Sequence, residues 1–168
     1  MTIPDRLRPF WEAFKHSRSD VNDAQFYEVC TFGDSAELID ELADLVLRGT
    51  KRATAGAMWA YEAEGCRPPR PGDLSIVTNA AGTPLCIIET RSVEVMRFDE
   101  VTAEFAAAEG EGDGSLRYWQ DAHRAYFERE CARAGRKFTP DMRVACERFD
   151  VVFQPARGTY PPADNTAT

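Results

Sequence analysis

The chain has 168 residues, of which 43% are hydrophobic, and this composition predicts one soluble globular domain with a buried core. The formal net charge of −8 argues against broad, non-specific binding to a nucleic-acid backbone, which needs clustered lysine and arginine, so any RNA should meet a local site. The sequence has no apolar run of the roughly 20 residues that span a bilayer, no apolar export signal and no CxxC pair among its five cysteines. We therefore expect a cytoplasmic protein without a membrane partner, a disulfide framework or a zinc site.

The first elements follow from hydrophobic periodicity. A helix from about residue 5 to residue 17 is predicted by apolar residues at helical spacing, namely Leu7, Phe10, Trp11 and Phe14. The aromatic and β-branched run at 25–32 predicts a strand. Asp34, followed by Glu37, is typical of a capping box that starts a second helix, and this helix should end at Gly49.

The middle of the chain predicts a hairpin. Residues 55–62 fit either a short helix or the end of a strand that begins near Thr54. Two strands are expected at 74–78 and 85–97, joined by a turn at 79–82. Apolar residues do not alternate cleanly in the second strand, which indicates a bulge or bend.

The last third predicts two more helices and a final strand. A short helix should end near Gly110, within an acidic, glycine-rich loop at 109–114. Ser115 then caps a longer helix that closes at Gly135, and 142–153 alternates as a strand. The pattern indicates an α+β domain built on a small β-barrel with flanking helices.

We divide the chain into three parts. Residues 1–24 form an N-terminal helical extension, 25–153 form the domain, and 154–168 form a loose tail rich in proline, glycine and threonine.

A lysine and a hydroxyl follow closely on the end of the second helix. Gly49 should turn the chain because glycine takes the left-handed conformation easily. Lys51 follows two positions later and Thr54 three positions after that. A lysine withdrawn from water loses its proton more easily, and a neutral amine beside a hydroxyl makes a base and a nucleophile. The alternative is that Lys51 and Arg52 are solvated loop cations and that Thr54 is a turn residue.

Several motifs in order resemble the activating-signal-cointegrator homology (ASCH) domain. They are Gly49-x-Lys51-x-x-Thr54, the Pro71-Gly-Asp73 turn, the Ile87-Ile-Glu-Thr90 strand, and Phe98-Asp-Glu-Val101 followed by the acidic loop from Glu109 to Asp113. The resemblance runs from about Phe32 to Phe153. It implies a β-barrel of the pseudouridine-synthase-and-archaeosine-transglycosylase (PUA-like) type, whose cleft handles RNA or a modified nucleoside.

The resemblance also implies an activity. Small bacterial ASCH proteins are amidohydrolases that remove the acetyl group of N(4)-acetylcytidine with a lysine, a threonine and a glutamate. By motif match these are Lys51 as base, Thr54 as nucleophile and Glu109 as acid. Other members that resemble this longer form are ribonucleases. The N-terminal helix and the insertion at Gly112–Gly135 depart from the small amidohydrolases, so the substrate does not carry over, and a non-catalytic RNA- or nucleotide-binding module is the alternative.

Further residues are candidates for binding. Arg52 suits a phosphate, and Trp59 and Tyr118 suit stacking on a base. Trp119 and His123 share the apolar face of the predicted long helix, which favours core positions for both.

No cofactor is expected, and protein partners are not predicted. Glu111 and Asp113, beside Glu109, carry oxygen ligands that suit a divalent cation. The alternative is that both are solvated loop charges.

Overall fold

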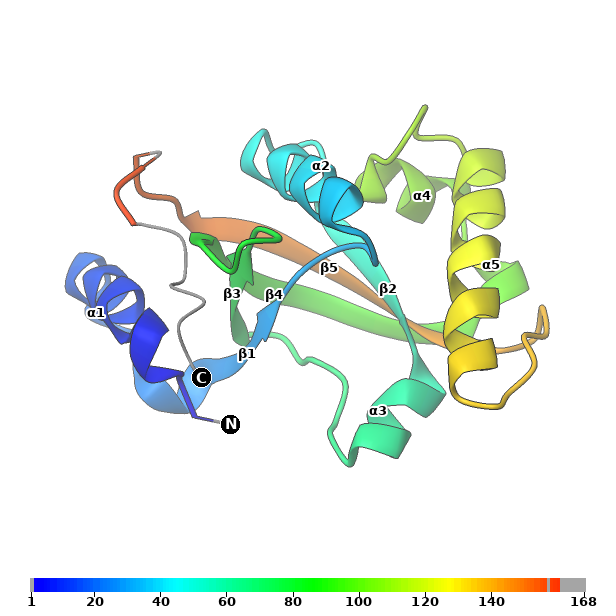
Figure 1. The fold of residues 1–168 in the computed structure, drawn as a ribbon, viewed down its shortest axis with the longest axis horizontal. Helices are drawn as coiled ribbons and strands as arrows, with labels where there is room; N and C mark the ends of the chain where they lie inside the picture. Colours follow the sequence, from blue (N-terminus) through cyan, green and yellow to red (C-terminus); the bar gives the residue numbers. More distant parts are fainter. Residues whose placement is uncertain (1, 157, 161–168) are drawn as a thin grey trace.

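The computed structural model describes residues 2–156 and 158–160 (Figure 1). Five strands form one mixed sheet, in which β1 pairs with β3 in parallel and all other neighbouring strands are antiparallel. In sheet order the strands are β1 (Phe26–Cys30), β3 (Leu74–Thr78), β4 (Pro84–Arg97), β5 (Arg143–Phe153) and β2 (Ala53–Ala57).

Helices surround this sheet in the described part of the chain. They are α1 (Arg8–Ser17), α2 (Ala36–Leu47), α3 (Met58–Glu64), α4 (Ala103–Glu109) and α5 (Leu116–Arg133), with 3-10 turns at Asp5–Leu7, Asp23–Gln25 and Phe98–Glu100. Figure 1 shows α1 at one end of the sheet and α5 at the other, with α2 between them. The predicted helices and strands are confirmed, and the ambiguous segment at 55–62 contains both alternatives, because β2 ends at Ala57 and α3 begins at Met58.

The start of α2 differs from the prediction. Ser35 rather than Asp34 caps the helix, since its hydroxyl accepts a hydrogen bond from the backbone N–H of Leu38 at 3.2 Å. Asp34 instead accepts a hydrogen bond from Arg129 of α5 at 2.9 Å. Asp34 is therefore engaged in a long-range ion pair, and the neighbouring serine, an equally good cap former, caps the helix.

The expected α+β class is confirmed, but the expected closed barrel is not formed. The sheet bends, with register shifts near Ile88 and between Thr90 and Ser92 that confirm the predicted bulge. In the described residues, however, the edge strands β1 and β2 pair only with β3 and β5. Near the edge strand β1, Tyr27 is buried and its hydroxyl donates a hydrogen bond to the carbonyl oxygen of Arg67 in the segment between α3 and β3.

Three apolar clusters form the core, one under each of the larger helices. The cluster beneath α1 contains Phe10, Trp11, Phe14, Leu74, Ile76 and Ile87. The cluster beneath α2 contains Phe32, Leu42, Val46, Val77, Ile88 and Phe149. The cluster beneath α5 contains Phe98, Phe105, Trp119, Phe127, Val144 and Cys146. The last two clusters form the walls between which the polar site lies.

The N-terminal helix and the start of the C-terminal segment pack on the same apolar cluster. The N-terminal helix α1 packs on β3 and β4. The ring of Tyr160 lies 4.9 Å from that of Phe10, centroid to centroid, so the start of the C-terminal segment covers α1. The rest of the expected tail, 161–168, lies outside the described residues. No described helix is long and apolar enough to cross a membrane.

Candidate functional site

The segment after α2 is fixed by backbone hydrogen bonds to three elements. Gly49 adopts a φ of +74°, as predicted for the residue past a helix end, and the N–H groups of Thr50 and Lys51 both bond to the carbonyl of Leu45, at 2.9 and 3.1 Å. Arg52 donates its N–H to Ala108 of α4 at 2.8 Å and accepts that of Phe149 of β5 at 2.9 Å. The side chain of Lys51 is therefore positioned by α2, α4 and β5 together.

Lys51 is buried between two carboxylates. Its side chain is 1% exposed, and Nζ donates to Oε2 of Glu109 at 2.8 Å and to Oε1 of Glu111 at 2.6 Å. The turn that carries these carboxylates approaches the lysine segment closely, since a Cβ on Gly110 would collide with the carbonyl oxygen of Thr50. Lys51 is thus neither a solvated cation nor a free amine.

Two aromatic side chains of α5 complete the surroundings of Glu109. Trp119 donates its indole N–H to Oε1 of Glu109 at 2.9 Å. His123 stacks on Trp119 with ring centroids 4.2 Å apart, contacts the Trp119 carbonyl oxygen through Nδ1 at 3.1 Å and places Nε2 3.4 Å from Oε1 of Glu109. Both residues are buried core residues as predicted, and both also hold the carboxylate, which was not predicted.

The charges of this cluster bear on the roles expected for Lys51 and Glu109. Burial alone would lower the pKa of Lys51, but the charges of Glu109 and Glu111 raise it above its ordinary value. Burial also favours the neutral form of Glu109, yet Lys51 and His123 hold the pKa of this carboxyl at about 2. Both directions favour the charged forms, an ammonium on Lys51 and a carboxylate on Glu109, and these forms do not suit the expected roles of base and acid.

Thr54 lines the same pocket as Lys51 and Glu109. This pocket, of about 360 Å³, is lined by residues of α2, β2 and α5. Tyr118 stands at its rim, 43% exposed, with its ring packed against Gly112. The structure thus brings together Lys51, Thr54, Glu109 and Tyr118.

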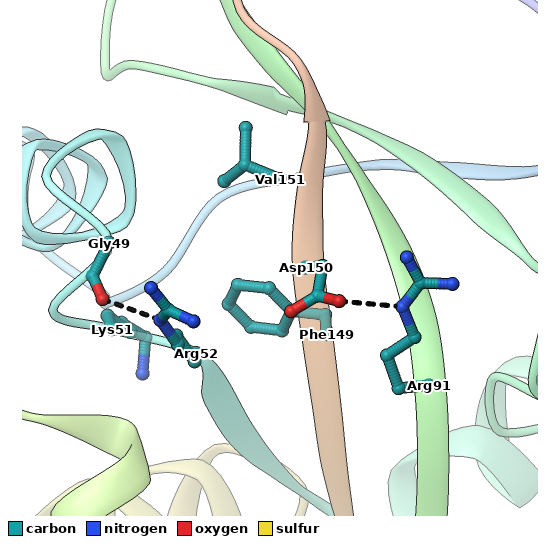
Figure 2. A pocket seen from close by; sticks show the side chains of 7 residues that line it. All are labelled: Gly49, Lys51, Arg52, Arg91, Phe149, Asp150 and Val151. Atoms are coloured by element: carbon teal, nitrogen blue, oxygen red, sulfur yellow. Dashed lines mark hydrogen bonds and ion pairs between the residues drawn. The ribbon is translucent and has the colours of Figure 1, made fainter.

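Arg52 and Trp59 lie outside this pocket. Arg52 borders a second hollow of about 390 Å³ that it shares with Arg91 and Asp150, and Figure 2 shows its Nε bonded to the carbonyl oxygen of Gly49 at 2.8 Å. Trp59 borders a third hollow beside α5, and its ring lies 5.1 Å from the Arg136 guanidinium. Trp59 therefore cannot stack on a base that is held beside Lys51.

Of the two residues predicted to suit a cation, only Glu111 lies in a cluster of possible ligand atoms. Glu109, Glu111 and His123 place ligand atoms within 4.8 Å of one another, whereas Asp113 accepts the backbone N–H of Ser115 at 2.8 Å. The ammonium of Lys51 already contacts both carboxylates of this group. A divalent cation would have to compete with that ammonium.

A further carboxyl group, missed in the sequence, lies across from Thr54. Glu147 of β5 is the direct partner of Thr54 in the β2–β5 ladder. It is 8% exposed and accepts a hydrogen bond from the hydroxyl of Thr90 at 2.6 Å. The strand also contains Arg143, Arg148 and Asp150, so its sequence contains no clear signal for Glu147.

The fold and the site together are those of an α+β domain with a buried lysine in a polar pocket. Comparisons with known proteins identify the family to which this domain belongs. The ASCH domain model matches residues 28–153, and the chain belongs to the ASCH domain family, which is linked to RNA binding.

Two solved structures are similar over most of the chain. The crystal structure of an ASCH domain from Lactobacillus crispatus JV V101 is 39% identical and covers 90% of this chain and 97% of its own, with a TM-score of 0.83. That of a protein from Enterococcus faecalis V583 is 34% identical and covers 89% of each chain, with a TM-score of 0.80. No curated protein matches the sequence.

Proposed function

We propose that the protein hydrolyses an N-acyl group of a modified nucleoside in the pocket of Lys51 and Thr54. The observation that carries this proposal is the buried ammonium of Lys51, held by two carboxylates in a pocket that the Thr54 hydroxyl also lines. A volume of about 360 Å³ suits one nucleoside better than a strand. The net charge of −8 also favours a neutral substrate over a polyanion.

The geometry suggests revised roles within the lysine, threonine and glutamate set. The hydroxyl of Thr54 attacks the acyl carbon, and the ammonium of Lys51 stabilises the oxyanion that forms there. Glu109 fixes the position and charge of Lys51, and Tyr118 stacks on the base at the rim of the pocket. No step in this scheme is assigned to a metal ion.

A parallel assay of two substrates tests this proposal. The protein is incubated with N(4)-acetylcytidine and, separately, with a short RNA, and acetate release and strand cleavage are measured. We expect acetate release, its loss in Lys51→Ala, and its retention in Lys137→Ala, which removes an exposed lysine. Strand cleavage without acetate release would overturn the proposal in favour of a ribonuclease.

A non-catalytic RNA-binding module is the second candidate, and the hollow in Figure 2 favours it. Arg52 and Arg91 border this hollow, and guanidinium groups suit phosphate oxygens. A binder should hold RNA without turnover, lose affinity in Arg52→Ala and Arg91→Ala, and be indifferent to Thr54→Ala. Because the protein is acidic, we expect such binding to be weak and to decline steeply with salt.

A further inference from the structure

Thr54 needs a proton acceptor if it is a nucleophile, and the ionisable groups that line the pocket are engaged with one another. Lys51 pairs with Glu109 and Glu111, and His123 faces Glu109. Lys51 is already protonated, because its two carboxylates raise its pKa. Glu109 receives hydrogen bonds from Lys51 and Trp119 and faces His123, and its pKa of about 2 makes it a very weak base. A general base works best when its pKa lies near the working pH.

Glu147 is the carboxyl group placed to fill this role. Residues directly opposite in an antiparallel ladder share one face of the sheet, with Cβ atoms about 4.5–5.5 Å apart, and Thr54 and Glu147 are such a pair. One oxygen of Glu147 accepts the hydroxyl of Thr90, and the other makes no hydrogen bond within the described residues. Burial raises the pKa of this carboxyl to about 7.

We propose that Glu147 takes the proton from Thr54 during acyl transfer and returns it to the leaving amine; this inference rests on the proposed function. In the first half, the Thr54 oxygen bonds to the acyl carbon while its proton moves to Glu147. The C–N bond then breaks, and the amine nitrogen takes that proton.

In the second half, water attacks the acyl carbon of the threonine ester and gives its proton to Glu147. The ester C–O bond breaks, and the Thr54 oxygen takes the proton back. The sum is one amide and one water converted to one acid and one amine, while Lys51 keeps its charge throughout.

The environment of Glu147 includes groups from every neighbouring element. The titratable groups that interact with it are Glu28 and Cys30 of β1, Lys51, Tyr61 of α3 and Asp73 before β3. The hydrogen bond from Thr90 and the charge of Lys51 lower the pKa of Glu147, whereas Asp73 raises it. Glu28 is a matched control, because burial raises the pKa of this carboxyl to about 7 as well, yet its strand does not pair with that of Thr54.

The test uses p-nitrophenyl acetate, which delivers an acetyl group whatever the natural substrate is. Acetylation of the Thr54 peptide is followed by mass spectrometry from about pH 5 to about pH 9. In the wild type we expect the rate to rise through about pH 7 and then level off. Glu147→Gln should lose this rise and react about 10²-fold more slowly or worse. Thr90→Val should move the rise to higher pH. Glu28→Gln should retain the rise and move it only to lower pH, because it removes a like charge that interacts with Glu147.

Each outcome decides one claim. If Thr54 is acetylated equally fast, with the same pH profile, in Glu147→Gln, the role of Glu147 is overturned and Thr54 remains the nucleophile. If Glu147→Gln does not fold, an unmoved profile in Thr90→Val overturns the role instead. If Thr54 is not acetylated in the wild type, the nucleophile itself is wrong, and this inference fails with the proposed function.

Discussion

The ammonium of Lys51 lies 2.8 Å from Oε2 of Glu109, and each of these side chains is only 1% exposed. Removing one partner of a buried ion pair leaves an uncompensated charge and costs about 3–5 kcal/mol. We therefore expect Lys51→Met and Glu109→Gln each to lower the free energy of unfolding by about that amount, and the double variant to lose clearly less than the sum. Urea unfolding of the four proteins measures this coupling. Additive losses would show that the two charges do not depend on each other.

The indole of Trp119 should contribute more than packing. Trp119→Phe removes a hydrogen bond to the buried Glu109, which is worth about 1.5–3 kcal/mol because the acceptor is charged. Trp11→Phe is the matched control, since Trp11 is equally buried but donates to Asp23, whose side chain is 48% exposed. We expect Trp119→Phe to be the more destabilising change in thermal unfolding. Equal losses of thermal stability in the two variants would show that Trp119 contributes through packing alone.

Replacing Gly110 should have two effects that can be measured separately, one from its close approach to Thr50 and one from its left-handed backbone conformation. Gly110 and Gly65 both follow seven-residue helices, with φ of +64° and +66°, but a Cβ at Gly65 would meet nothing within 4 Å. Gly65→Ala should cost about 1–2 kcal/mol for the left-handed conformation. Gly110→Ala should cost about 1–3 kcal/mol more and reduce turnover, because it displaces Glu109 from Lys51. Similar stability and activity of the two variants would contradict the tight contact.

Stability should depend on pH in two opposite ways. The pKa of Glu109 falls from 4.5 to about 2 on folding, so its contribution is present above about pH 4.5 and is lost as the pH falls toward 2. Those of Glu28 and Glu147 rise from 4.5 to about 7, so their contributions are present below about pH 4.5 and are lost as the pH rises through 7.

We therefore expect the protein to be more stable at about pH 5 than at about pH 8, by a few kcal/mol. Urea unfolding at both values measures the difference. Glu147→Gln should reduce it, because the amide resembles the neutral acid, whereas Glu62→Gln at an exposed position should not. Stability that rises steadily from pH 5 to pH 8 would contradict the two raised pKa values.

Local patterns located the elements because periodicity and caps act over a few residues. The helical spacing of its apolar residues was enough to predict α1, and the glycine at position 49 was enough to predict the end of α2. Asp34 was wrongly predicted to cap α2. Its partner Arg129 lies 95 positions away in the sequence, and a rule that considers only neighbouring residues cannot predict that ion pair.

The site was predictable as a set of residues but not as an arrangement of charges. The motif placed Lys51, Thr54 and Glu109 together, yet the raised pKa of Lys51 depends on two carboxylates that reach it from a distant turn. The pairing of Thr54 with Glu147 depends on the register of β5, which the whole sheet determines. Long-range pairing therefore accounts for what the sequence could not show.

Turnover of N(4)-acetylcytidine by variants of Thr54 tests the central claim most directly. Thr54→Ala keeps Lys51 and Glu109 but removes the nucleophile, so acetate release should fall by about 10²-fold or more, while Thr54→Ser should remain active. Each variant is first shown to be folded by circular dichroism. The account predicts an inactive alanine variant and an active serine variant. Acetate release at the wild-type rate by Thr54→Ala would contradict it and leave Thr54 without a catalytic role.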